Sequence, residues 1–150
     1  MPQLTNEIFI AVKPRIVFDY VTRPDLWHEW HPASTSAKLP RVPLHEGDEF
    51  DEIITVTYPL VKVQRPTRYR VTLSRRADAF EVQGSSSLFD LTIHYDLEAH
   101  DGGTRFLRTL TYEVKGPLRY VEPIVVRPRI AGQSATALAN LRRLLENQGS

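Results

Sequence analysis

The spacing of apolar residues changes once along this chain, and that change limits the folds open to it. Upstream of Gly116, apolar and polar side chains alternate with a period of two in five segments, as in strands that bury one face: 49–58, 61–73, 79–84, 88–98 and 104–114. Downstream of Pro128 the apolar residues follow helical spacing, which predicts a helix of about 30 Å over residues 128–147. One helix cannot bury its apolar stripe alone, so this helix must lie against the sheet.

The links between the predicted strands are short. Residues 100–103, with the sequence HDGG, connect two of the segments, and Asp-Gly and Gly-Gly pairs tolerate the positive φ angles of tight hairpins. Links of this length join antiparallel neighbours. The sheet is therefore predicted to be antiparallel.

The first thirty residues predict one strand and two short helices. Residues 6–12 read as the strand, and Pro14 suits the first turn of a helix, where its missing N–H matters little. Thr22 is predicted to cap the second helix. Trp27 and Trp30 are three residues apart, so they share one face of that helix.

Composition excludes several classes of protein. The chain has 150 residues, which fits one domain over residues 1–150, and its formal net charge of +1 is too balanced for a nucleic-acid-binding surface. It has no cysteine, which excludes disulfides and thiolate metal sites. No signal peptide and no run of about 18 apolar residues is visible, so we expect a cytoplasmic protein without stable membrane insertion.

The order of these elements resembles the helix-grip fold of the START-like (SRPBCC) superfamily, which includes bacterial polyketide cyclases and Bet v 1-type proteins. Three segments carry the resemblance: IFIAVKPRIVFDYVTRPDLWHEWHP, GGTRFLRTLTYEV and RPRIAGQSATALANLRRLLE. The resemblance implies an α+β fold in which a seven-stranded curved antiparallel sheet wraps around a long C-terminal helix, with two short helices between strands 1 and 2. It also implies an apolar cavity between the sheet and that last helix.

Alternation along the strands places one acid and one base on the inward faces. Glu52 falls among apolar neighbours in segment 49–58, and Arg108 does so in segment 104–114. A buried charge without a partner is costly, so each side chain needs one. Glu52 and Arg108 either pair with each other across the cavity or contact a ligand, unless a shift of the strands brings them to water.

The same reasoning predicts the residues that contact a ligand. Tyrosines can act as polar groups within an apolar pocket, and we expect two of Tyr58, Tyr69, Tyr95 and Tyr112 to touch the cavity. Small residues in the first turns of the last helix should leave space beside it. The predicted ligand contacts are Trp27, Trp30, His31, Phe50, Glu52, Ile54, Tyr69, Tyr95, Arg108, Tyr112, Ala131, Ala135 and Leu138.

The stretch DLWHEWHP, residues 25–32, has three interpretations. His28 and His31 are three residues apart, which is not the spacing of the zinc-protease motif, and no third ligand is evident, so we expect no metal and no other cofactor. The second interpretation is a lid, in which Trp27 and Trp30 pack over the open end of the cavity. The third is that one tryptophan belongs to the core and the other is half exposed.

Three functions remain open at this point. The first is binding of a hydrophobic small molecule such as a lipid, a polyketide or an aromatic metabolite. The second is a polyketide cyclase or dehydratase, in which Arg108 and a tyrosine polarise a ketone while Glu52 moves a proton. The third is an interaction protein of the co-chaperone type, for which no surface feature stands out. A homodimer is left open.

Overall fold

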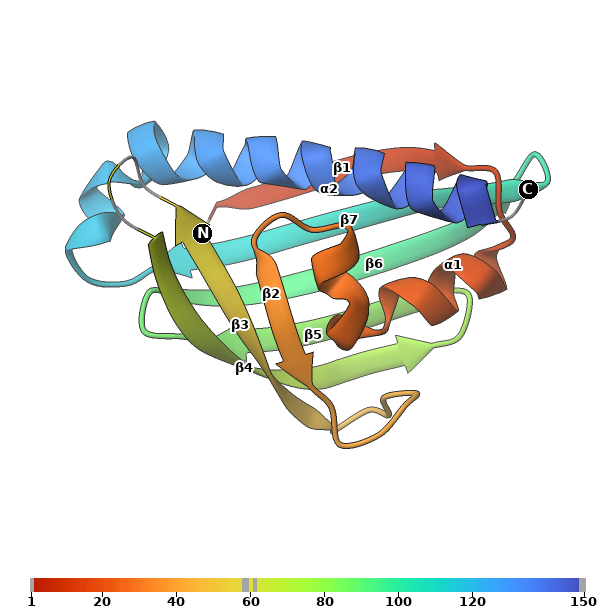
Figure 1. The fold of residues 1–150 in the computed structure, drawn as a ribbon, viewed down its shortest axis with the longest axis horizontal. Helices are drawn as coiled ribbons and strands as arrows, with labels where there is room; N and C mark the ends of the chain where they lie inside the picture. The colour runs from red at the N-terminus through yellow and green to blue at the C-terminus, as the bar shows by residue number, and fades with distance from the viewer. Residues whose placement is uncertain (1, 58–59, 61, 149–150) are drawn as a thin grey trace.

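The chain forms a curled seven-stranded sheet with a long helix lying across its concave face (Figure 1). The computed structural model describes residues 2–57, 60 and 62–148. The elements in chain order are β1 (Gln3–Ile10), α1 (Pro14–Val21), the 3₁₀ helix η1 (Pro24–Glu29), β2 (Ser34–Lys38), β3 (Glu49–Thr57), β4 (Lys62–Arg75), β5 (Ala79–Ser85), β6 (Phe89–His100), β7 (Gly103–Val114), the 3₁₀ helix η2 (Gly116–Val121), the π-helical turn η3 (Glu122–Val126) and α2 (Arg127–Gln148).

The strand order is β1-β7-β6-β5-β4-β3-β2, and every neighbouring pair is antiparallel. The predicted α+β helix-grip fold is therefore confirmed. β1 and β2 lie at opposite edges of the sheet, so α1 and η1 carry the chain from one edge to the other. In the predicted hairpin, Asp101 and Gly102 adopt φ angles of 47° and 77°, the region that favours such turns.

Two strands differ from the sequence-based expectation. The first strand covers Gln3–Ile10 and not 6–12, because the chain leaves the sheet after Ile10 and the Ala11 N–H donates to Glu146 Oε2 at 2.9 Å. β2 was not predicted from periodicity. Its sequence, STSAK, is an edge strand without apolar alternation, and its residues are half-buried or exposed.

Thr22 does not cap the second helix as predicted. Its hydroxyl donates to the Phe18 carbonyl at 2.8 Å and so completes the last turn of α1. η1 begins after Arg23, and no side chain caps it. The predicted apolar face of α1 is confirmed, because it buries Val17, Phe18 and Val21.

The helix predicted over residues 128–147 is confirmed as α2 and lies against the sheet, but its buried stripe differs in phase over the first turns. The sequence favoured Ala131 and Ala135 as inward-facing residues. Ala135 is exposed and Ala131 only half-buried, whereas Ser134 is buried at 1 % exposure. Each residue advances about 100° around a helix, so Ala135 turns away once Ser134 faces the sheet. The buried stripe of α2 is Ser134, Ala137, Leu138, Leu141 and Leu145.

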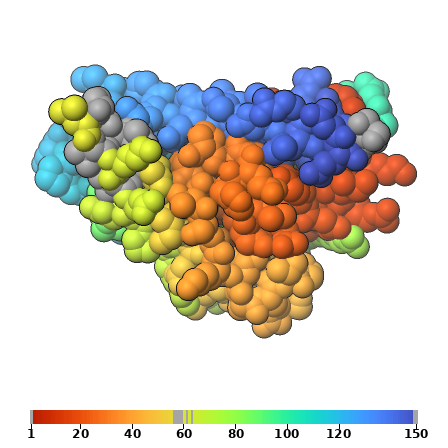
Figure 2. All heavy atoms as spheres, in the orientation of Figure 1, coloured from red at the N-terminus to blue at the C-terminus, as the bar shows by residue number. Residues whose placement is uncertain are grey.

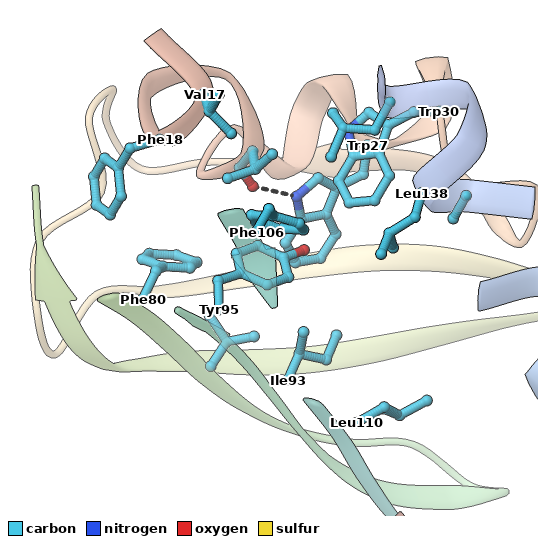
Figure 3. Packing of buried hydrophobic residues seen from close by; sticks show 14 of the residues in the cluster. Val17, Phe18, Trp27, Trp30, Phe80, Ile93, Tyr95, Phe106, Leu110 and Leu138 are labelled. Atoms are coloured by element: carbon cyan, nitrogen blue, oxygen red, sulfur yellow. Dashed lines mark hydrogen bonds between the residues drawn. The ribbon is translucent and has the colours of Figure 1, made fainter. Parts of the chain in front are cut away.

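Aromatic side chains of the sheet gather beneath α1 in the core (Figure 3). The rings of Phe18 and Phe80 meet edge to face at 6.2 Å, and those of Tyr95 and Phe106 lie 5.1 Å apart. Trp27 fixes η1 to α1, because its indole N–H donates to the Val21 carbonyl at 2.8 Å. On the outside, atoms of α1, η1 and β2, in red and orange, lie directly below the blue helix α2 and cover the centre and right of this face (Figure 2).

Candidate functional site

A cavity of about 130 Å³ lies between the sheet and the first half of α2. Since a water molecule needs about 10–15 Å³ of such space, the cavity has room for roughly ten waters or a small organic molecule. Its wall is mainly apolar, with side chains from β6 and β7 as its floor: Phe89, Leu91, Ile93 and Leu110. A cavity of this kind suits a small ligand with an apolar body.

The mouth of the cavity lies beside η3 and the start of α2. Val125 and Arg129 line the cavity and are also exposed to solvent. Two further apolar side chains of this region, Tyr120 and Ile124, are 73 % and 79 % exposed. A ligand entering here would pass along η3 and the first turn of α2.

The structure brings most of the predicted contacts into the cavity wall. Those that line it are Trp27, Trp30, His31, Glu52, Ile54, Tyr69, Tyr95, Arg108 and Tyr112. Phe50 and Leu138 are buried but lie outside the lining, and Phe50 stacks on the Tyr69 ring at 5.0 Å. Ala131 and Ala135 are not in the wall, because the inward stripe of α2 passes through Ser134. Three of the four tyrosines considered line the cavity, whereas Tyr58 lies outside the described residues.

Ser34 and Ser134 are polar residues of the wall that the sequence did not reveal. Ser34 belongs to β2, whose lack of apolar alternation hid the strand. Ser134 was hidden by the small residues on either side of it, which blur the phase of the helix. The one signal for these serines in the sequence is that each buried charge needs a hydrogen-bond partner. Ser34 is the partner of Glu52, and Ser134 is the partner of Arg108.

Glu52 is buried in the wall and held by two hydroxyl groups. The Ser34 hydroxyl donates to Oε2 at 2.5 Å, and the Tyr69 phenol donates to Oε1 at 3.2 Å. Burial raises the pKa of Glu52 to about 7, while these two hydrogen bonds and the charge of Arg108 act in the opposite direction. Near neutral pH the carboxyl group is therefore poised to gain or lose a proton.

Gly84 sets the position of the Tyr69 ring. The two residues face each other across β4 and β5. A Cβ at residue 84 would lie 2.5 Å from ring carbons of Tyr69. The ring thus packs directly on the glycine, and this contact directs the phenol toward Glu52.

Arg108 lies in the wall with 4 % of its surface exposed. Its Nη1 donates to the Ser134 hydroxyl at 3.1 Å, its Nη2 lies 3.4 Å from His31 Nε2, and its Nε is buried without a partner. No ion pair joins Arg108 to Glu52, although both residues are described. The sequence left open a direct ion pair between Glu52 and Arg108, and that prediction is wrong. Exposure of the two side chains to water, the other alternative, is also wrong, because each is only 4 % exposed.

Apart from Arg129 at the mouth, the other titratable groups of the wall are neutral. Burial, with a smaller contribution from the charge of Arg108, lowers the pKa of His31 to about 3. Burial also raises the pKa of Tyr95 to about 12, against the opposing effect of Arg108. The Tyr112 phenol is occupied elsewhere, since it donates to Glu122 Oε2 at 2.8 Å and ties η3 to β7.

The two tryptophans form a closed wall of the cavity. Trp27 and Trp30 are 4 % and 2 % exposed, so neither projects from the surface. Trp27 contacts Phe50 and Tyr69 edge to face at 6.0 and 5.9 Å. Both indoles therefore belong to the core and to the cavity at once.

The metal interpretation of DLWHEWHP has no geometric support in the described residues. His28 is exposed, whereas His31 points into the wall, so the two rings do not converge. Within residues 2–57, 60 and 62–148 no group of three or more metal-binding side chains comes together. Over the same residues, no helix has both the length and the apolar character needed to cross a membrane.

Comparisons with known proteins agree with this geometry. A model of the family described as polyketide cyclase / dehydrase and lipid transport matches residues 1–146. No curated protein sequence matches the chain. Among solved structures, a protein of Thermus thermophilus, TTHA0849, is similar with a TM-score of 0.76 and 15 % identity, over 99 % of this chain and 100 % of that one.

Two further solved structures share the fold. A START superfamily protein of Mycobacterium smegmatis has a TM-score of 0.68 and 12 % identity, over 97 % of this chain and 95 % of that one. Ara h 8.0201 has a TM-score of 0.66 and 18 % identity, over 95 % of this chain and 96 % of that one. At these identities the likeness establishes the fold and nothing about the ligand.

Proposed function

This chain belongs to the family described as polyketide cyclase / dehydrase and lipid transport, as the resemblance to START-like proteins predicted, and from that premise we propose that it binds a hydrophobic small molecule inside the cavity. The observation that carries the proposal is an apolar cavity of about 130 Å³ between the sheet and α2. An empty cavity of that size lowers the free energy of unfolding, because the side chains that line it lack van der Waals contacts on one side. A bound ligand restores these contacts.

The ligand can be sought without knowing its identity. We expect native mass spectrometry of the freshly purified protein to reveal a co-purified apolar compound that is released on denaturation. Leu110→Phe adds volume to the cavity floor and should reduce the bound fraction. Ala139→Phe places the same ring on the exposed face of α2 and serves as the control. Equal occupancy in both variants would mean that the compound lies elsewhere.

A second function, catalysis of the cyclase or dehydratase kind, is favoured by one feature, the carboxyl group of Glu52. Burial brings its pKa to about 7, which suits a general acid or base at neutral pH. In this role Glu52 would move a proton while Arg108 and a tyrosine polarise a ketone of the substrate. The catalytic roles of Glu52 and Arg108 are part of the proposal.

Two variants separate catalysis from binding. An enzyme should lose turnover in Glu52→Gln and in Arg108→Met, while the affinity of Glu52→Gln for its ligand changes little. A binding protein should show no turnover in any form. If no chemical change of a bound polyketide-like ligand is detected with the unmodified protein, the catalytic proposal fails and the binding proposal stands.

Other expectations from the sequence remain predictions: a cytoplasmic location, no nucleic-acid partner, no cofactor and a homodimer as one state of assembly. Sedimentation at several protein concentrations would test the last of these directly.

A further inference from the structure

Two hydrogen-bond donors meet in the cavity wall with no acceptor between them. The Ala33 N–H donates to Nδ1 of His31 at 3.1 Å. Because burial lowers the pKa of His31 to about 3, the imidazole is neutral at neutral pH, and a neutral ring that accepts at Nδ1 carries its proton on Nε2. That Nε2–H lies 3.4 Å from Nη2 of Arg108, which is also a donor.

The guanidinium of Arg108 has more N–H donors than it has acceptor partners among the described residues. It offers five N–H groups and accepts nothing. The Ser134 hydroxyl accepts one of them, the phenol of Tyr95, which faces Arg108 across β6 and β7, accepts another, and Nε is buried without a partner. Asn6 faces Arg108 across β1 and β7, and its buried Oδ1 is also without a partner, but an amide oxygen is neutral and supplies no negative charge.

The charges of the inner wall do not balance. Arg108 is permanently positive and 4 % exposed. Glu52 is the acid of the wall, and with a pKa of about 7 it is only partly ionised at neutral pH. A buried charge without a full counter-charge is costly, and the usual remedy is an anion held by direct hydrogen bonds.

We propose that the cavity binds a ligand with a single carboxylate, whose oxygens lie between Arg108 and His31 while its apolar body covers Leu110 and Ile93. This inference rests on the proposed binding function and specifies its ligand class. A carboxylate accepts two parallel hydrogen bonds from a guanidinium and has lone pairs left for the imidazole N–H. Of the two arginines that line the cavity, Arg129 is exposed at the mouth and Arg108 alone is buried, and one buried positive charge suits a monoanion better than a phosphate dianion.

The test compares two probes of nearly equal shape and different charge, octanoate and octanamide. Trp27 and Trp30 are the two tryptophans of the chain and both line the cavity, so their fluorescence reports binding directly. At about pH 6 octanoate is ionised, whereas most Glu52 is protonated. We expect octanoate to bind about tenfold more tightly or better, the effect of charge-assisted hydrogen bonds.

Two arginine variants locate the preference on one side chain. Arg108→Met should bring octanoate down to the affinity of octanamide, while octanamide itself binds as before or slightly better. Arg105→Met is the control, because Arg105 lies on the exposed face of the same strand and pairs with Glu7. Retention of the tenfold preference in Arg108→Met would overturn the proposal.

A second measurement needs only the unmodified protein. Octanoate labelled at its carboxyl carbon can be titrated by NMR in the bound state. A carboxylate held by Arg108 should keep its charge to a lower pH than free octanoate does. An unchanged or raised carboxyl pKa contradicts the proposal even if Arg108→Met does not fold.

The possible results separate failure of the carboxylate inference from failure of the proposed binding function. If octanoate and octanamide bind equally well, the carboxylate inference fails and the apolar binding function stands. If octylamine binds more tightly than octanoate, the positive charge assigned to the cavity is wrong and the carboxylate inference fails. If neither octanoate nor octanamide changes the tryptophan fluorescence or the melting temperature, both the inference and the proposed function fail.

Discussion

The two ends of α2 cover the same sheet in opposite ways. At the closed end, Leu141 and Leu145 are fully buried and belong to the core cluster to which α1 contributes Val17 and Phe18. At the hollow end, which comprises His31, Glu52, Arg108, Leu110 and Ser134, the helix presents a serine to an arginine and a cavity remains. Both ends use one helix and one set of strands, so the choice of side chains decides where the molecule is filled.

This contrast explains how the fold tolerates buried polar groups. The closed end buries aromatic and aliphatic side chains, which supply most of the favourable free energy of folding per residue. The hollow end contains a buried acid and a buried base, Glu52 and Arg108, without a direct ion pair, an arrangement that lowers stability. The closed end should therefore contribute most of the free energy of unfolding. The hollow end should determine how that free energy changes with ligand and pH.

The largest expected difference comes from shortening one leucine at each end. Leu141→Ala leaves a new void in a filled core and should lower the free energy of unfolding by about 4 kcal/mol, whereas Leu110→Ala only enlarges a cavity that already exists and should cost about 2 kcal/mol. Urea denaturation of both variants measures this. Equal losses would show that the two ends are packed alike.

The next effect is a dependence of stability on pH at the hollow end. The folded-state pKa of Glu52, about 7, lies above its ordinary value, so the folded chain holds this proton more tightly than the unfolded chain. The resulting stabilisation is complete below about pH 4.5 and is lost as the pH rises through 7, a change of about 3 kcal/mol. Glu52→Gln should remove this loss and be more stable than the unmodified protein at about pH 8.

His31 should produce the opposite slope. Its folded-state pKa is lowered to about 3, so it stabilises the fold above the ordinary histidine value and that contribution is lost as the pH falls. Between the two ordinary values the effects of Glu52 and His31 oppose each other. Between about pH 4.5 and 6.5 the free energy of unfolding of the unmodified protein should thus be nearly independent of pH, and over the same range it should slope in opposite directions for Glu52→Gln and His31→Asn. Parallel curves would contradict the assignment of these groups to one buried wall.

A smaller effect is expected at Gly84, on which the ring of the cavity-lining Tyr69 packs. In Gly84→Ala the new methyl group would lie 2.5 Å from the Tyr69 ring, so the ring must move and its hydrogen bond to Glu52 weakens. Such overpacking costs about 1–3 kcal/mol. Gly132→Ala is the matched control, because no atom lies within 4 Å of its added Cβ and alanine favours the helix by about 1 kcal/mol. Thermal denaturation that ranks the two variants the other way would rule out the close contact.

Much of the fold and part of the site follow from local patterns in the sequence. The alternation in segments 49–58 and 104–114 placed Glu52 and Arg108 on the inward face correctly, because the pleat of a strand fixes side-chain direction residue by residue. The same rule identified the tyrosines of the wall. These features depend only on near neighbours in the chain.

What the sequence could not supply depends on contacts between distant segments. β2 lies at a sheet edge and needs no apolar face, so its alternation is absent. Ser134 is buried because it meets Arg108, and a run of alanine, glycine and serine does not reveal which of them faces inward. The partners of Glu52 are likewise supplied by β2 and β4.

The most direct test of the account is a crystal structure of the protein soaked with bromobenzene, a neutral apolar probe whose bromine can be located by anomalous scattering. We predict a bromine peak enclosed between α2 and the sheet, in contact with Leu110 and Ile93 and absent from Leu110→Phe. A cavity closed by its own side chains, with bromine bound only at the outer surface, would contradict the claim that this fold keeps one end hollow for a ligand.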